Sequence, residues 1–147
     1  MVKNRWGYLQ TGSGVPEGEL GVISRTIDLN YTGSICSSAF GLDKPADVDA
    51  INKYGGFGIS YPRLAIVDGE WDPWRAATPH ALGQPDRQST ISEPFILIDK
   101  AVHHWDENGV WPNETTPNFP PPAVQEAQKV LREAVVAWVD EYKKSSS

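Results

Sequence analysis

The sequence predicts an α/β protein in which two parallel strands are followed by a long helix. Two apolar runs, Leu64–Val67 and Phe95–Ile98, are bounded on both sides by turn-forming residues. Such continuous runs are typical of strands that are buried on both faces of a parallel sheet. A helical stripe of apolar residues extends from about residue 122 to 143. This order of elements resembles the last third of an α/β sheet protein.

The amino-terminal part of the chain has little regular pattern. Residues 1–19 are rich in glycine and are expected to form loops. Between residues 20 and 40, apolar residues recur at a loosely helical spacing with interruptions, which predicts two short helices. Asp43 as N-cap and Pro45 in the first turn predict another short helix, which Tyr54-Gly55-Gly56 would end.

The segment between the two predicted strands must act as a crossover if the strands are parallel. Residues 75–90 contain too many Pro, Gly and polar residues for a long helix, although a helical turn is expected between Trp74 and His80. After the second strand, Pro120-Pro121-Pro122 leads into the carboxy-terminal helix. Its apolar stripe is Val124, Ala127, Leu131, Ala134, Val135, Trp138, Val139 and Tyr142.

The overall composition excludes several classes of protein. The chain has 147 residues and a net charge of -6, which would repel a nucleic acid. No apolar run reaches the roughly 18 residues that a membrane span needs. The amino-terminal residues 1–6 lack the apolar region of a signal peptide. We therefore expect no nucleic-acid partner and no membrane span. No cofactor is expected either.

Two features concern the cellular compartment, which the residues alone leave open. Asn30-Tyr31-Thr32 and Asn113-Glu114-Thr115 both fit the acceptor pattern for N-glycosylation, which matters only in the secretory route. Cys36 is the only cysteine. In a cytosolic protein it would be a small buried hydrophobic residue, and in a secreted protein it would lack a disulfide partner.

The candidate site residues follow the two predicted strands. Asp72 lies in the loop after the first strand, and His103 follows the second strand by a few residues. Open α/β sheets hold their active sites at the carboxyl ends of strands, so the two side chains are expected at the same edge. A carboxylate can orient a histidine and stabilise its protonated form, which is the chemistry of an acid-base pair.

Each of these residues also has a simpler interpretation. Asp72-Pro73 could be an ordinary turn, with its flanking tryptophans in the core. A metal site at His103-His104 is disfavoured, because adjacent histidines point in different directions and no accompanying ligand motif is present. His80 is expected in solvent or in the connection. Both alternatives for Asp72 remain open at this level.

A nucleophile is not apparent in the sequence. No G-x-S-x-G motif occurs, and Ser13 between two glycines lacks the preceding strand and following helix of a nucleophile elbow. We therefore assign Ser13 to a loop. Cys36 precedes any predicted strand and lies in a segment with helical spacing, which favours a structural role for its thiol.

Several motifs together resemble a known family. They are Trp6-Gly7-Tyr8-Leu9-Gln10-Thr11-Gly12, Tyr54-Gly55-Gly56, Arg63, Gly69-Glu70-Trp71-Asp72-Pro73-Trp74, Val102-His103-His104 and the closing helix. The chain resembles the lysosomal Pro-X carboxypeptidase family of serine peptidases, which includes dipeptidyl peptidase 7 and secreted fungal members. The resemblance implies an α/β-hydrolase fold with a helical insertion. Residues 1–56 would then belong to the insertion, and residues 57–147 to the carboxy-terminal α/β-hydrolase portion.

The resemblance also implies roles for the candidate residues. Asp72 matches the acid of the triad and His103 its base, with His104 as the neighbour that could be confused with the base. The family has Asn where this chain has Asp68, and its C-T-E run before Trp6 is Lys3-Asn4-Arg5 here. Cys36 would be left without the disulfide partner that this run provides. Family members are secreted or lysosomal and cleave next to proline or release dipeptides.

These observations lead to two expectations about function. The first is a carboxy-terminal fragment of a serine exopeptidase, with peptides containing proline as substrates and the missing amino-terminal portion as a possible partner. Such a fragment has the triad Asp72 and His103 without the serine, and we expect it to be inactive alone. The second is a non-catalytic protein that binds peptide or glycan through Trp71, Trp74, Trp105 and Trp111.

Overall fold

The computed structural model describes residues 7–12 and 14–146, and the residues 1–6, 13 and 147 lie outside the described part. The chain divides into two compact units, residues 1–56 and residues 57–147. The motif residue Trp6 and the loop residue Ser13 are therefore outside the part that the structure describes.

The first unit contains helix α2, Leu29–Phe40, and helix α3, Val48–Asn52. The carboxylate of Asp28 caps α2 by accepting a hydrogen bond from the backbone N–H of Tyr31 at 2.8 Å. Gly41, with φ of 61°, ends this helix in the left-handed conformation. The expectation of two short helices between residues 20 and 40 is wrong, because residues 20–28 form turns and bends and α2 continues through Gly33.

Helix α3 begins later than the sequence predicts. Its N-cap is Asp47, whose Oδ1 accepts a hydrogen bond from the backbone N–H of Ala50 at 3.1 Å, and the expected cap at Asp43 is wrong. Gly55 and Gly56 both have positive φ and follow the helix, as expected for a stop. Of the described residues in this unit, only Gly12 is buried. The unit therefore has little core of its own.

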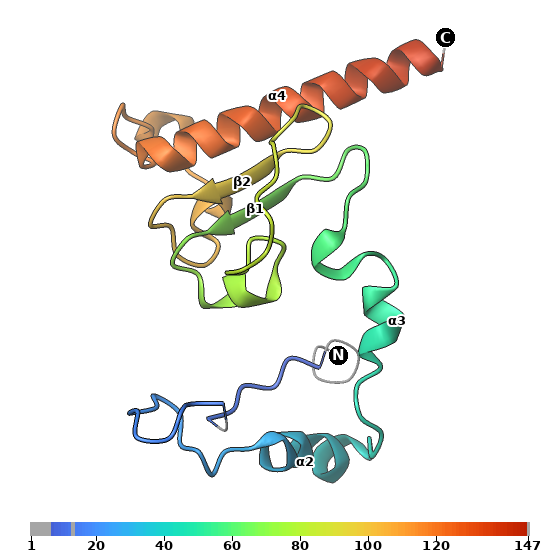
Figure 1. Cartoon of the computed structure of the whole chain (residues 1–147). Coiled ribbons are helices and arrows are strands. Elements are labelled where there is room, and N and C mark those ends of the chain that lie inside the picture. The colour runs from blue at the N-terminus through green and yellow to red at the C-terminus, as the bar shows by residue number, and fades with distance from the viewer. Residues whose placement is uncertain (1–6, 13, 147) are drawn as a thin grey trace. The chain divides into compact units, whose positions relative to one another are not determined.

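The second unit contains a small parallel sheet (Figure 1). Strand β1, Ile66–Gly69, pairs with strand β2, Phe95–Ile98, so that Ile66 lies opposite Phe95 and Gly69 opposite Ile98. The parallel pairing is confirmed, and β2 has the predicted bounds. β1 begins two residues later than predicted, because Leu64 donates to the carbonyl of Tyr61 in a turn and Arg63 has a φ of 67°. It also ends two residues later, because the expected turn residues Asp68 and Gly69 pair with β2. The predicted helical turn in the connection is the 3₁₀ helix η2, Pro73–Ala77.

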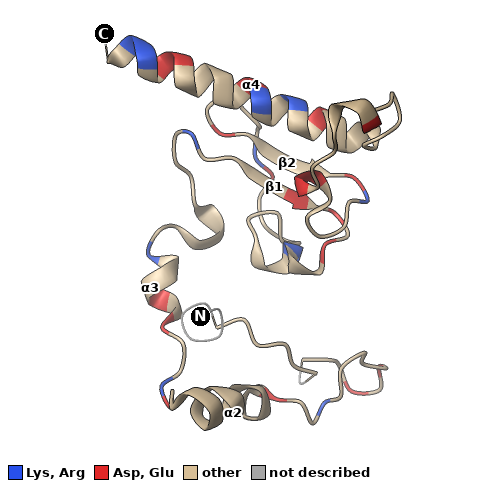
Figure 2. Ribbon diagram, turned by 180° about the vertical axis from the view of Figure 1, so that it is seen from behind, with Lys and Arg blue, Asp and Glu red and all other residues tan. Residues whose placement is uncertain are grey.

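Helix α4, Pro122–Ser145, confirms the predicted carboxy-terminal helix and packs along the sheet (Figure 1). Its buried residues are Val124, Ala127 and Ala134. Ala127 joins Ile98 and Ala101 in a buried cluster, against which Val67, Ile96 and Trp105 pack. Acidic and basic residues both occur along α4, with Lys143 and Lys144 in the last turn (Figure 2). Ala127 thus joins the helix to the strands. Val135, Val139 and Tyr142, which also belong to the predicted apolar stripe, are exposed, so the expectation that the whole stripe is buried is wrong.

The expectation that both strands are buried on both faces is wrong. In β2, Ile98 is buried and Ile96 packs against the buried cluster, whereas Leu97 is 38% exposed. Successive side chains in a strand point to opposite faces, so Leu97 points away from the face that this cluster covers. In the second unit, the described residues form a two-stranded parallel sheet with one helical layer, which supports the α/β class.

Among the described residues, no helix combines the length and apolar character that crossing a membrane requires.

Candidate active site

Asp72 lies where the chain leaves β1. Its backbone is extended, with φ of −72° and ψ of 122°, as expected for a residue before proline. It is the N-cap of η2, and its Oδ1 accepts a hydrogen bond from the backbone N–H of Trp74 at 2.8 Å. Pro73 occupies the first helical position, where its missing N–H is not needed. The turn thus fixes one carboxylate oxygen and leaves the other for a partner.

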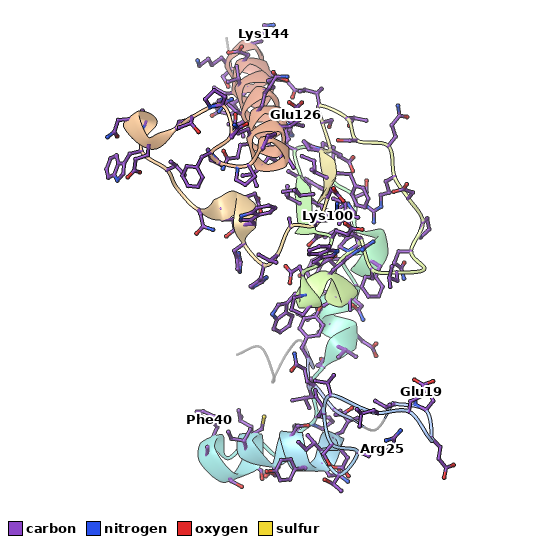
Figure 3. The ribbon with its side chains drawn as sticks, turned by 90° about the vertical axis from the view of Figure 1, so that its left-hand side faces the viewer. Glu19, Arg25, Phe40, Lys100, Glu126 and Lys144 are labelled. Carbon is purple, nitrogen blue, oxygen red and sulfur yellow. The ribbon has the colours of Figure 1, made fainter. Side chains whose placement is uncertain are left out.

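The loop after β2 approaches this turn closely. The backbone N–H of Trp71 donates to the carbonyl of Ala101 at 2.9 Å. The carboxylate of Glu70 accepts a hydrogen bond from the backbone N–H of Lys100 at 2.9 Å, and Figure 3 labels Lys100 beside the strands. A Cβ atom on Gly69 would lie 2.5 Å from the carbonyl oxygen of Ala101. Only a glycine at this position permits such an approach of the two backbones.

Asp72 and His103 are brought together by these loops. The Oδ2 atom of Asp72 lies 2.7 Å from Nδ1 of His103. The Asp72 side chain is 9% exposed and the His103 side chain 45% exposed. A carboxylate at this distance holds the imidazole in the tautomer with its proton on Nδ1, which leaves Nε2 to exchange a proton with another group.

The environment of Asp72 favours its charged form. Burial raises the pKa of this carboxyl, but the hydrogen bonds from His103 and from the N–H of Trp74, together with the charges of His103 and His104, lower it more. The net result is a pKa below its usual value. Asp72 is therefore a carboxylate at neutral pH and remains an acceptor for His103.

His104 has a different partner from His103. Its Nδ1 lies 2.7 Å from Oε2 of Glu107, and its backbone is left-handed with φ of 57°. The two imidazole rings are 3.7 Å apart between centroids and are inclined at 61°. Within the described residues, Asp72 is hydrogen-bonded to His103 and not to His104, and no group of three or more His, Cys, Asp or Glu side chains could hold a metal ion.

The structure contains a second aspartate–histidine pair, which the sequence did not predict. His80 was expected either in solvent or in the connection. It lies in the connection, and its side chain is only 5% exposed. Its Nδ1 lies 2.7 Å from Oδ2 of Asp68, and its ring stacks on Phe95 at 3.8 Å between centroids. No motif or periodicity marks His80, because its burial depends on how the connection folds back onto β1.

The remaining candidates are the two possible nucleophiles. Ser13 lies outside the described residues. Cys36 is a free, half-buried thiol in α2, in the first unit. Asp72 and His103 belong to the second unit. The two glycosylation candidates, Asn30 and Asn113, are both exposed.

Comparison with known proteins relates the chain to serine peptidases. It is 54% identical over 136 residues to a "Probable extracellular serine carboxypeptidase" of Arthroderma benhamiae, which covers 92% of this chain and 19% of that protein. It is 31% identical over 115 residues to the "Serine protease vicPa" of Bipolaris victoriae, with 72% of this chain and 21% of that protein covered. The chain therefore spans about a fifth of the length of these relatives. No family model matches it.

Proposed function

We propose that this chain is part of a serine peptidase of the carboxypeptidase type, in which Asp72 is the acid and His103 the general base of the catalytic triad. The single observation that carries the proposal is the hydrogen bond between Asp72 Oδ2 and His103 Nδ1 at 2.7 Å. The similarity to serine peptidases over 92% of the chain supports the reaction class. The substrates are peptides.

The role of each residue follows from its geometry. The Nε2 atom of His103 takes the proton of a serine hydroxyl as that hydroxyl attacks the peptide carbonyl, and later returns the proton to the leaving amine. Asp72 holds the tautomer and stabilises the imidazolium that forms between these steps. His104 has its own carboxylate partner in Glu107 and is not the base.

Within this proposal the serine comes from outside the 147 residues, since no G-x-S-x-G occurs in them. The finer specificity that the sequence motifs imply, cleavage next to proline or release of dipeptides, also belongs to the proposal. The chain alone is expected to have no peptidase activity, because loss of the triad serine in subtilisin reduces kcat by about 10⁶. An exposed sequon such as Asn113-Glu114-Thr115 fits a glycosylated, secreted product.

A chimera tests the assignment of Asp72 and His103. The matching 136-residue segment of the Arthroderma benhamiae relative is replaced by this chain, and peptide hydrolysis is compared with that of the unmodified relative. We expect an active chimera. In subtilisin, loss of the histidine costs on the order of 10⁶ in kcat and loss of the aspartate on the order of 10⁴, and losses of this size are expected for His103→Ala and Asp72→Ala.

His104→Ala is the matched control in this chimera and is expected to retain most of the activity. A folded, inactive chimera beside an active parent would refute the proposal, and so would an active His103→Ala variant. Turnover of proline-containing peptides by the 147-residue chain alone, if abolished by His103→Ala, would contradict the expected need for an external serine.

A second candidate function is non-catalytic binding of peptide or glycan. The exposure of Trp71 and Trp111, 62% and 72%, favours this alternative, since tryptophan is enriched in binding interfaces relative to the rest of a protein surface. Trp105 packs against the buried cluster and does not contribute to such a surface. Binding of a peptide by the 147-residue chain that survives Asp72→Ala and His103→Ala but not Trp71→Ala would favour this candidate.

A further inference from the structure

The second aspartate–histidine pair lies beside the loop that carries Asp72. Asp68 belongs to β1, and His80 lies just beyond η2, so the two residues enclose the whole segment 69–79. Their side chains are 11% and 5% exposed. We call this segment the acid loop. The hydrogen bond between Asp68 and His80 joins the two ends of the acid loop and attaches it to β1.

Arg75 strengthens the closure from inside the acid loop. Its Nε donates to the carbonyl of His80 at 2.8 Å, and its Nη1 donates to the carbonyl of Glu70 at 3.3 Å. Both ends of the loop are therefore tied to one guanidinium. In addition, the His80 ring stacks on Phe95, the first residue of β2, at 3.8 Å between centroids. The side chain of His80 thus attaches the acid loop to both strands, to β1 through Asp68 and to β2 through Phe95.

The position of Asp72 depends on this arrangement. Asp72 lies within the acid loop, between Glu70 and Arg75. Its Oδ2 must point toward His103, which lies in a separate loop. An acid-base pair functions only when its geometry is kept within a fraction of an ångström, which requires supporting hydrogen bonds behind it. The Asp68–His80 pair is placed to provide such support.

A contribution to stability alone does not explain a buried pair of this kind. Removing two polar groups from water costs free energy that their attraction offsets only in part, and replacement of such a pair by apolar side chains is often neutral or stabilising. What a directional hydrogen bond adds and an apolar contact does not is a fixed orientation. The expected benefit is therefore orientation of the acid loop.

We propose that His80, through its hydrogen bond to Asp68, is a positioning residue that holds the acid loop so that Asp72 meets His103. This inference rests on the proposed function of Asp72 and His103 and extends it to a pair that does not touch the substrate. Its observable consequence is the tautomer of His103. A well-aimed Asp72 keeps the proton on Nδ1, whereas a displaced Asp72 lets the proton occupy either nitrogen.

The test measures the His103 tautomer in the full chain by the ¹⁵N chemical shifts of its ring above the pH at which the ring is protonated. The decisive variant is Asp68→Leu/His80→Phe, which keeps an aromatic ring on Phe95 and leaves no unpaired buried charge, so it is expected to fold. The ratio of Nδ1–H to Nε2–H tautomer in His103 should fall about fivefold, as expected for loss of about 1 kcal/mol of hydrogen bonding.

A conservative variant and a control complete the test. Asp68→Asn retains an oxygen that can accept a hydrogen bond from His80, so this variant should keep the wild-type tautomer ratio of His103. Gln125→Ala removes hydrogen bonds to the carbonyls of residues 116, 117 and 120, none of which belongs to the acid loop, and should leave the ratio unchanged. This control shows whether a loss of stability alone can alter the tautomer ratio of His103.

The outcomes separate this inference from the proposed function. A wild-type His103 without the Nδ1–H tautomer would contradict the pairing with Asp72 and therefore the proposed function itself. A wild-type ratio that persists in Asp68→Leu/His80→Phe would overturn only the positioning role of His80. A fall in the ratio that Gln125→Ala reproduces at equal loss of stability would also overturn it.

Discussion

The Nδ1 atom of His103 lies 2.7 Å from Oδ2 of Asp72, although 31 positions separate the two residues in the sequence. The hydrogen bond joins the loops that leave two adjacent parallel strands. Parallel pairing makes this possible, because it brings the carboxyl ends of both strands to the same edge of the sheet. The meeting of Asp72 and His103 is therefore a consequence of the parallel pairing of β1 and β2.

The hydrogen bond predicts a pH-dependent contribution to stability. Since the pKa of Asp72 is lowered in the folded state, its carboxylate stabilises the fold above its usual pKa, and this stabilisation is lost as the pH falls through the lowered value. We expect Asp72→Asn to reduce the free energy of unfolding at about pH 6 and to have no such effect at low pH, where the acid is protonated in both states. Urea unfolding at a series of pH values measures this difference. An equal effect of the substitution at every pH would contradict it.

Gly69→Ala should separate the two loops that form the candidate site. The new Cβ would lie 2.5 Å from the carbonyl oxygen of Ala101, so the backbone after β2 must move. We expect a loss of about 1–3 kcal/mol in the free energy of unfolding, as for other overpacked positions. Urea unfolding measures the loss, and the amide of Trp71, which donates to Ala101, should exchange faster with solvent.

Gly109→Ala is the matched control for this substitution. No heavy atom lies within 4 Å of the Cβ position at Gly109, in the same unit of the chain. Its free energy of unfolding should therefore remain close to that of the wild type. If both alanine variants lost the same stability, close approach of the loops at Gly69 would not be the cause.

The N-cap of α3 provides a direct comparison between two aspartates. Asp47 accepts a hydrogen bond from the N–H of Ala50, whereas Asp43, four residues earlier, lies outside the helix. Asp47→Ala should destabilise the helix by about 1 kcal/mol, and Asp43→Ala should not. Hydrogen exchange of the Ala50 amide measures the difference. Faster exchange in Asp43→Ala than in Asp47→Ala would mean that the helix begins at the earlier residue.

Those two aspartates also illustrate what the sequence could predict in this chain. Capping residues and apolar periodicity are local signals, and they located α4, β2 and the existence of α3. They did not locate the start of α3, because Asp43 and Asp47 are both acceptable caps and residue type alone does not distinguish them. The start of β1 was missed for a similar reason, since the turn at Arg63 removes Leu64 and Ala65 from the strand.

The structure brings together the two candidate residues that follow the predicted strands, while their catalytic roles stay a prediction. Asp72 and His103 could be placed at one edge of the sheet from strand positions alone. His80 could not, because it lies in the irregular connection and its burial against Phe95 depends on the path of that connection. The exposure of Leu97 was missed because an apolar run does not reveal how many layers cover a sheet.

The small residues of α4 set how closely this helix approaches the sheet. Ala127 is 2% exposed and lies in the cluster with Ile98 and Ala101, where a larger side chain has no space. Ala127→Leu should reduce the free energy of unfolding by about 1–3 kcal/mol, because the added atoms push the helix from the strands.

Ala123→Leu, at an exposed position in the first turn of α4, is the matched control and should change the free energy of unfolding by less than about 0.5 kcal/mol. Urea unfolding of both variants measures the contrast. Equal stability of the two variants would mean that α4 does not pack on β2 through Ala127.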